Sequence, residues 1–233
     1  MVLAALPMRA ADDIQFQPTI TAEDFATFSR IIAQGIYADP IQPARSSGLL
    51  HFDIGIGATL MKVDQNADYW KRSVPKDIIA HGGYVGVPRL IVAKGYGGGT
   101  ISGTYAKISD TGIKIYGGAL DMPIIRGGVA KPEISLRGVY TKLSGVDVYR
   151  LKTYGVEAFI SKGFGPITPF AAVGRMKTDA RGSVDSVNFT LKDKSSINRY
   201  SAGVRLSLFV PKIVLEATQA EQRSYSAKIS VGW

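Results

Sequence analysis

The chain has 233 residues, of which 45% are hydrophobic and 20% charged, with no cysteine and a formal net charge of +9. This composition excludes a disordered tail and a bundle of membrane-spanning helices, and the absence of cysteine excludes disulfides, thiolate metal sites and cysteine nucleophiles. The high glycine and tyrosine content favours a β-rich fold, and the excess of basic residues indicates an anionic partner.

The N-terminal part of the chain differs in pattern from the rest. Residues 1–11 read like the end of the apolar region of a signal peptide, or like a disordered arm. Residues 12–47 form an N-terminal segment with a predicted helix at 22–36, capped by Thr21. Its apolar stripe is too short to span a bilayer and needs a surface to cover it. We therefore expect the helix in the periplasmic mouth of a barrel or inside its lumen.

From residue 48 onward the hydrophobic period changes to two. In the first run, Ile54, Ile56 and Leu60 share one face with other apolar residues, while polar residues and glycines occupy the other. The length suits a tilted strand that crosses a bilayer of roughly 30 Å. The same pattern recurs, which predicts strands at about 50–63, 84–95, 100–109, 112–121, 132–143, 149–162, 167–177, 198–209, 212–220 and 223–233. The predicted fold is all-β: a closed antiparallel transmembrane β-barrel over residues 48–233, of about ten strands (eight to twelve).

The predicted connections differ between the two ends of the barrel: the odd-numbered ones are 64–83, 109–112, 144–148, 178–197 and 220–223, and the even-numbered ones are mostly tight. The connections 64–83 and 178–197 are long and polar, whereas 95–99, 163–166 and 210–212 are tight turns, and 122–131 is an exception. Long loops on one side and short turns on the other are typical of an outer-membrane barrel whose termini lie in the periplasm. A soluble sandwich has no reason to sort its loops in this way, so we expect a bacterial outer-membrane location.

The last strand carries the most specific local signal. Apolar residues occupy alternate positions up to a terminal aromatic residue: Tyr225, Ala227, Ile229, Val231 and Trp233. A final strand of this kind resembles the signal by which the barrel-assembly machinery recognises outer-membrane proteins. We expect Tyr225, Ile229, Val231 and Trp233 to form that assembly signal.

Three stretches of the chain, 48–57, 87–90 and 136–166, carry a family resemblance. They include the sequences Gly-Leu-Leu-His-Phe-Asp-Ile-Gly-Ile-Gly, Val-Pro-Arg-Leu and Leu-Arg-Gly-Val-Tyr-Thr-Lys-Leu-Ser-Gly-Val-Asp, and end in Ser-Lys-Gly-Phe-Gly-Pro. Across residues 48–233 the chain resembles small proteobacterial outer-membrane β-barrels, and within them a barrel family with no assigned activity. The resemblance implies location and fold, and it implies no catalytic residues.

Charged residues recur on the face of the strands that is predicted to point inward. The predicted lumen charge network consists of Asp53, Arg89, Lys114, Glu133, Arg137, Glu157, Arg205, Glu216 and Lys228. Ionisable groups shielded from lipid pair with one another or meet water. Because the positive and negative groups nearly balance in so narrow a barrel, we expect a structural network in a plugged or narrow lumen. A substrate path is the less favoured alternative.

Basic residues recur at outward-facing positions of the strands that run toward the outer leaflet. Each lies at the point where its strand is predicted to reach that leaflet. These are Lys62, Lys107, Lys142 and Arg175, and Tyr105 and Tyr140 lie two residues below two of them, where an aromatic girdle belongs. We expect these four residues to form a rim that faces lipopolysaccharide phosphate. The alternative is ordinary snorkelling of basic side chains without a lipid preference.

Three functions remain open. The favoured one is a non-enzymatic barrel, structural or a narrow conduit for small solutes, with outer-membrane lipid, lipopolysaccharide and the assembly machinery as partners. The second is a barrel hydrolase acting on lipid or peptide through His51, with Asp53 and a serine of the last strand (Ser224, Ser226 or Ser230). The third is a soluble lipocalin-like binder of apolar ligands. We expect no nucleic-acid partner, cofactor or metal, because the glycine run 95–103 lacks the Lys-Ser/Thr and the helix of a phosphate loop, and neither His51 nor His81 has metal-ligand spacing.

Overall fold

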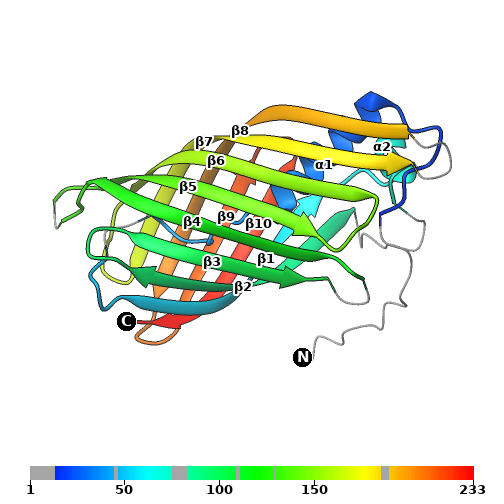
Figure 1. Ribbon diagram of the computed structural model, residues 1–233. Helices are drawn as coiled ribbons and strands as arrows, with labels where there is room; N and C mark the ends of the chain where they lie inside the picture. The colour runs from blue at the N-terminus through cyan, green and yellow to red at the C-terminus, as the bar shows by residue number, and fades with distance from the viewer. Residues whose placement is uncertain (1–13, 45–46, 75–82, 109–110, 129, 185–188) are drawn as a thin grey trace.

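The computed structural model describes residues 14–44, 47–74, 83–108, 111–128, 130–184 and 189–233. Ten antiparallel strands form a closed barrel in which β1 pairs with β10, so the predicted fold class is confirmed (Figure 1). The strands are β1 (Phe52–Lys62), β2 (Tyr84–Gly95), β3 (Thr100–Lys107), β4 (Lys114–Ile125), β5 (Glu133–Ser144), β6 (Tyr149–Ser161), β7 (Ile167–Val184), β8 (Phe189–Ser207), β9 (Lys212–Gln219) and β10 (Arg223–Gly232). The helices within these described ranges are α1 (Ala22–Ile36) and α2 (Asp68–Lys71). The predicted residues 1–11 and His81 lie outside the described residues.

Alternation of side chains fixes which face of each strand points inward. In β6, for example, buried and exposed residues alternate along nearly the whole strand. Successive side chains of a strand point to opposite faces, so one set fills the lumen and the other covers the outside of the barrel. The exposed set includes large apolar residues on several strands, such as Ile56, Ile101, Val156 and Leu215. The barrel therefore has an apolar outer surface and a filled interior.

The strands β7 and β8 extend far beyond the rest of the wall. The predicted polar loop at 178–197 is wrong, because β7 continues to Val184 and β8 begins at Phe189, with a ladder from Ile167↔Leu206 to Val184↔Phe189. The inner face of this extension is covered: Ala180, Val184 and Leu191 are buried in the cluster that also contains Phe25. These parts of β7 and β8 are polar in sequence, yet they form strands because the N-terminal segment provides an apolar surface against which their inner face packs.

The helix α1 lies inside the barrel wall, at the end opposite Phe52 and Trp233 (Figure 1). A capping box of Thr21 and Asp24 begins it, and its Phe25, Phe28 and Ile31 are fully buried. The Ser29 hydroxyl accepts a hydrogen bond from Tyr149 at the start of β6. The sequence predicts α1 in the periplasmic mouth or inside the lumen, and the structure has it inside the lumen; which end of the barrel faces the periplasm stays a prediction. No helix among the described residues is long and apolar enough to cross a membrane.

Residues 37–44 continue from α1 down the lumen as an extended, largely buried segment, which we call the lumen segment. Ile41 and Ala44 pack in a second buried cluster with Ile91, Phe159 and Val214 of the wall. The wall makes room by glycine: a methyl group at Gly117 would collide with Ala38, and one at Gly155 would collide with the Tyr37 hydroxyl. Helix and lumen segment together fill the interior from one end toward the other.

Candidate functional site: the filled lumen and the basic outer rim

The centre of the lumen holds a buried cluster around Arg137 of β5. Its Nε and Nη2 donate to the two carboxylate oxygens of Asp121 on β4, at 2.6 and 3.1 Å. Its Nη1 donates to Asp39 of the lumen segment at 2.9 Å, and its Nη2 also reaches the carbonyl oxygen of Gln42 at 2.9 Å. The guanidinium lies over the Phe159 ring, 4.2 Å from its centroid. One fully buried side chain thus joins two strands to the lumen segment.

A second arginine, Arg199 of β8, holds the lumen segment from another side. Its Nε donates to Glu157 of β6 at 2.9 Å, and its Nη2 lies 3.8 Å from Asp39. The guanidinium stacks over the Tyr37 ring with 4.1 Å to the centroid. Asp39 therefore lies between two buried arginines, and charge brought in by the N-terminal segment helps to balance the charge of the wall.

Arg89 of β2 binds the backbone of the N-terminal segment. Its two Nη atoms donate to the carbonyl oxygens of Tyr37 and Gly35, at 2.5 and 2.8 Å, just where α1 ends. Nη2 also donates to Thr59 of β1 at 2.9 Å. The last carbonyl groups of a helix lack intrahelical partners, so Arg89 satisfies groups that α1 leaves open and ties them to the wall.

Nearer the C-terminal end of the lumen, Asp53 of β1 gathers a third group of charges. Lys228 and Lys212 each donate to its carboxylate at 3.2 Å, as does Ser230. Lys228 also donates to the side chain of Gln42 at 2.8 Å. The cavity beside them has a volume of only about 10 Å³, space for about one water molecule.

The structure places most of the predicted lumen charges inside the barrel. Asp53, Arg89, Arg137, Glu157, Glu216 and Lys228 are buried there. Glu133 and Arg205 have the inward parity but are half-buried near the strand ends, where Arg205 donates to Thr168. The prediction for Lys114 is wrong: it is exposed, because Ile115 takes the inward position of β4. The predicted inward face of β4 is therefore displaced by one residue. This displacement also explains why Asp121, which is buried in the lumen, is absent from the predicted network.

Three further lumen charges are absent from the predicted network: Asp39, Arg199 and Lys212, the last with the same inward parity as Glu216. Asp39 lies outside the predicted barrel, so its place in the lumen depends on the fold of the N-terminal segment. Arg199 stands at the beginning of the predicted strand 198–209, with the same inward parity as Arg205, and this parity was a signal that would have found it.

His51 contacts the last residue of the chain. Its Nδ1 lies 2.8 Å from the backbone oxygen of Trp233, which also accepts a hydrogen bond from the Phe52 backbone N–H at 3.0 Å. Of the serines considered as nucleophiles, Ser230 donates to Asp53, Ser226 pairs with Thr59 and Ser224 accepts from Gln34. These contacts fasten β10 to β1 and to α1, and they give His51 a role in closing the barrel.

Aromatic residues mark both ends of the outer surface. Toward the α1 end, exposed tyrosines form cross-strand pairs: Tyr105 with Tyr116, and Tyr140 with Tyr154, with ring centroids 5.3 and 5.2 Å apart. At the opposite end, the exposed Tyr96, Phe164 and Phe209 lie in three of the turns, and Trp233 is exposed at the end of the chain. Aromatic belts at both edges of an apolar surface are typical of proteins that span a membrane.

The four predicted rim residues are all exposed on the outer face. Lys62 and Lys107 end β1 and β3, and Lys142 lies near the end of β5. The predicted rim position of Arg175 is wrong: β7 continues to Val184, and Arg175 lies opposite Val156, further from the α1 end than Lys177 opposite Tyr154. Additional exposed lysines stand beside them: Lys114 pairs with Lys107, and Lys152 pairs with Lys142. The predicted assembly signal is likewise on the outer face, since Tyr225, Ile229, Val231 and Trp233 are exposed. Recognition of these residues by an assembly machinery stays a prediction.

Comparison with known proteins gives structural likeness only. No family model matches the chain, and no curated protein matches it in sequence. Among solved structures, Neisserial surface protein A has 9% identity and a TM-score of 0.31, covering 78% of this chain and 94% of its own. Ail of Yersinia pestis, solved with the heparin analogue sucrose octasulfate, has 10% identity and a TM-score of 0.30, covering 82% and 97%. The Acinetobacter baumannii outer membrane protein Omp33 has 8% identity and a TM-score of 0.30, covering 79% and 100%.

Proposed function

We propose that the chain is a non-enzymatic outer-membrane β-barrel with a structural role, closed to solutes by its own N-terminal segment. The observation that carries this proposal is Asp39, a residue of that segment held between Arg137 and Arg199 inside the barrel. A closed barrel leaves no unpaired sheet edge and satisfies its backbone internally, as lipid requires. Its exposed apolar surface, bounded by aromatic residues, is the surface that such a protein turns to the bilayer.

Several contacts support a closed lumen over an open conduit. Buried ion pairs join the lumen segment to β5 and β8, and Arg89 binds it to β2. Large side chains of α1 fill the lumen at the end opposite Trp233. A soluble lipocalin-like binder needs an apolar interior and a polar exterior, whereas this barrel has buried charges inside and exposed isoleucines, leucines and valines outside. In the proposed orientation the start of β1 and the end of β10 face the periplasm, so α1 lies at the end of the barrel that faces the cell exterior.

Conductance measurements in planar lipid bilayers test the proposal. The full chain, refolded into vesicles, is expected to give no stable single-channel current, whereas deletion of residues 12–40 removes α1 and Asp39 and should open a conducting pore. Heat-modifiable migration on a gel verifies that both proteins form barrels. Large, stable currents from the full chain would overturn the closed lumen. If the correctly folded deletion variant also gives no current, the N-terminal segment is not what closes the lumen.

A further inference from the structure

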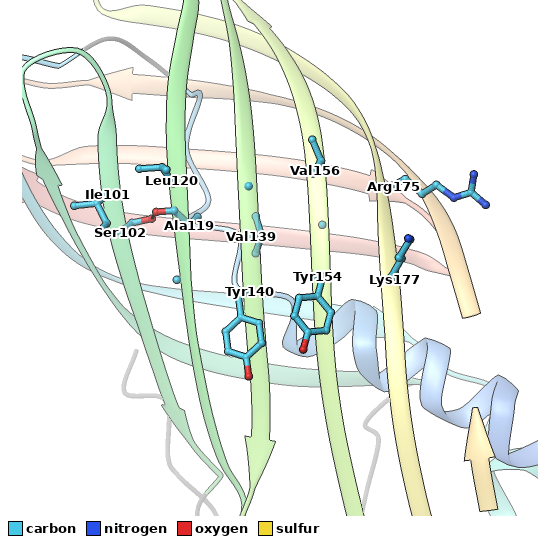
Figure 2. Close-up of a pocket in the computed structure, with 13 residues that line it drawn as sticks. Ile101, Ser102, Ala119, Leu120, Val139, Tyr140, Tyr154, Val156, Arg175 and Lys177 are labelled. Atoms are coloured by element: carbon cyan, nitrogen blue, oxygen red, sulfur yellow. Dashed lines mark hydrogen bonds between the residues drawn. The ribbon is translucent and has the colours of Figure 1, made fainter. Parts of the chain in front are cut away.

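The outer face of β3 to β7 combines two features that are separate from the contacts inside the lumen. One is a hollow in the lipid-facing wall with a volume of about 790 Å³, lined by Ile101, Leu120, Tyr140, Tyr154 and Val156 among others (Figure 2). The other is the group of cross-strand lysine pairs toward the α1 end, Lys107 with Lys114 and Lys142 with Lys152. We propose that together they form a binding site for a phosphorylated, multiply acylated lipid of the outer leaflet, that is, lipopolysaccharide.

Outward-facing glycines create the hollow. Gly118 of β4 lies opposite Tyr140, and Gly138 of β5 lies opposite Leu120 on one side and Val156 on the other. A methyl group added at Gly138 would meet no atom within 4 Å, so the space outside the backbone there is open. Apolar side chains flank the glycines, and half or more of Val156 and Ile101 is exposed. In a membrane, an acyl chain is the group that fills such a depression.

The lysine pairs lie on the same strands and the same face as the hollow. Tyr140 and Tyr154 stand side by side (Figure 2), and two residues further along each strand, toward the α1 end, stand Lys142 and Lys152. Tyr154 is also opposite Lys177, which lines the hollow together with Arg175. A molecule whose acyl chain lies against Gly138 would therefore carry its headgroup past the tyrosines and among the cations.

The charge of this region calls for an anionic ligand. Like charges directly opposite each other on a sheet destabilise it, yet Lys107 faces Lys114 and Lys142 faces Lys152. Among the described residues, no ion pair joins any of these four lysines to an acidic side chain. A second hollow of about 430 Å³ toward the α1 end is lined by four basic residues, Lys142, Arg150, Lys152 and Arg181, and two acids, Asp147 and Asp179. Asp179 lies opposite Lys152 and 3.9 Å from Arg181, so the basic residues still outnumber the acids by two.

The number of cations distinguishes lipopolysaccharide from a glycerophospholipid. One phosphodiester neutralises a single charge, whereas the region offers two lysine pairs and further arginines. A glycolipid that carries more than one phosphate and several acyl chains can place negative charge on both lysine pairs and apolar chain in the hollow. The site also lies toward the α1 end, which faces the lipopolysaccharide leaflet in the proposed orientation, with the start of β1 and the end of β10 in the periplasm.

Lipid titrations of the full chain in detergent micelles test the site. The probes are purified lipopolysaccharide, the same lipopolysaccharide with its phosphates removed, and phosphatidylglycerol, with bound lipid counted by native mass spectrometry. We expect the double variant Lys142→Gln/Lys152→Gln to bind lipopolysaccharide at least tenfold more weakly, since each basic residue near an anionic lipid surface contributes about a factor of five. The matched control, Lys94→Gln/Lys131→Gln, removes two exposed lysines at the other end of the barrel and should bind as the unmodified chain does.

A third variant tests the acyl-chain hollow. Gly138→Leu adds an apolar side chain to the hollow at a position where an added Cβ meets no atom within 4 Å. It should weaken lipopolysaccharide binding without changing the charge of the protein. Lys142→Arg/Lys152→Arg should retain binding, and heat-modifiable migration identifies any variant that fails to fold. Equal affinity for dephosphorylated lipopolysaccharide, equal affinity for phosphatidylglycerol, or undiminished binding by the folded glutamine variant would each overturn the proposed site.

Discussion

Arg137 and Asp39 form a buried ion pair across the lumen, with 2.9 Å between Nη1 and Oδ1, although 98 residues separate them in the chain. Arg137 belongs to the wall and Asp39 to the segment that fills the barrel. Asp121 is a second carboxylate on the same guanidinium. Removing one partner of a buried pair leaves uncompensated charge, so the wall and the N-terminal segment stabilise each other.

Replacing Arg137 by methionine is expected to destabilise the barrel by about 3–5 kcal/mol, the usual cost of breaking a buried ion pair by removal of one partner. The free energy of unfolding in urea, measured in lipid vesicles, checks this value. Lys114→Met is the matched control: Lys114 is exposed on the neighbouring strand, and its loss should change stability by less than about 0.5 kcal/mol. Equal losses in the two variants would contradict the inward position of Arg137.

The close approach of Tyr37 to Gly155 provides a second test. A methyl group at Gly155 would collide with the hydroxyl and ring of Tyr37, so Gly155→Ala should cost about 1–3 kcal/mol, as overpacking of a filled interior does. The measurement is the temperature at which heat-modifiable migration changes. Adding Tyr37→Ala should restore part of the loss caused by Gly155→Ala, whereas the outward Gly138→Ala should have no effect. A Gly155→Ala variant as stable as the unmodified chain would show that the lumen segment lies elsewhere.

The extension of β7 and β8 depends on α1 for its inner covering. Phe25 is fully buried, with its ring 5.3 Å from that of Phe16 and 6.0 Å from that of Tyr149. We expect Phe25→Ala to cost about 3–5 kcal/mol and to speed amide hydrogen exchange at residues 189–197 more than elsewhere. Phe189→Ala, which shortens an exposed side chain on the same extension, should leave exchange nearly unchanged. Exchange that rises uniformly over all strands in Phe25→Ala would contradict a local dependence.

The period-two pattern predicted the barrel because lipid on one side and a polar lumen on the other force alternation along every strand. The pattern failed where this contrast weakens. In β4, Ile115 points inward and Tyr116 outward, so both faces carry apolar residues and the assignment shifted by one, misplacing Lys114 and hiding Asp121. The polar sequence at 178–197 predicts a loop, but β7 continues to Val184 and β8 begins at Phe189, because α1 supplies the apolar surface that covers their inner face.

The interior of the lumen was the hardest part to predict. Charge balance among the strands indicated a filled lumen, but Asp39 belongs to a segment whose path no periodicity describes. Only the fold shows that residues 37–44 run beside Arg137 and Arg199. The rim lysines were easier to place, because an exposed position at a strand end follows from parity alone. Their direct opposition to Lys114 and Lys152 depends on the register between strands, which the sequence pattern leaves open.

Acid should loosen the contact between α1 and α2 through Asp24. Partial burial of this carboxyl opposes its ionisation, but hydrogen bonds from Thr21 and the neighbouring Arg72, 2.7 Å away, hold its pKa below the ordinary value. A pKa that is lower in the folded state contributes stability that is fully present above the unfolded value of about 4 and is lost as the pH falls through the folded value.

The unmodified chain should therefore melt at a higher temperature than Asp24→Asn at pH 6, and this gap should close as the pH falls below about 4. Asp68→Asn is the matched control, because Asp68 pairs with the same Arg72 at 2.9 Å but its side chain is 64% exposed. An exposed ion pair contributes little, so this variant should show only a small gap at any pH. A gap for Asp24→Asn that stays constant from pH 6 to pH 3 would show that the carboxylate charge is not what holds α1 against α2.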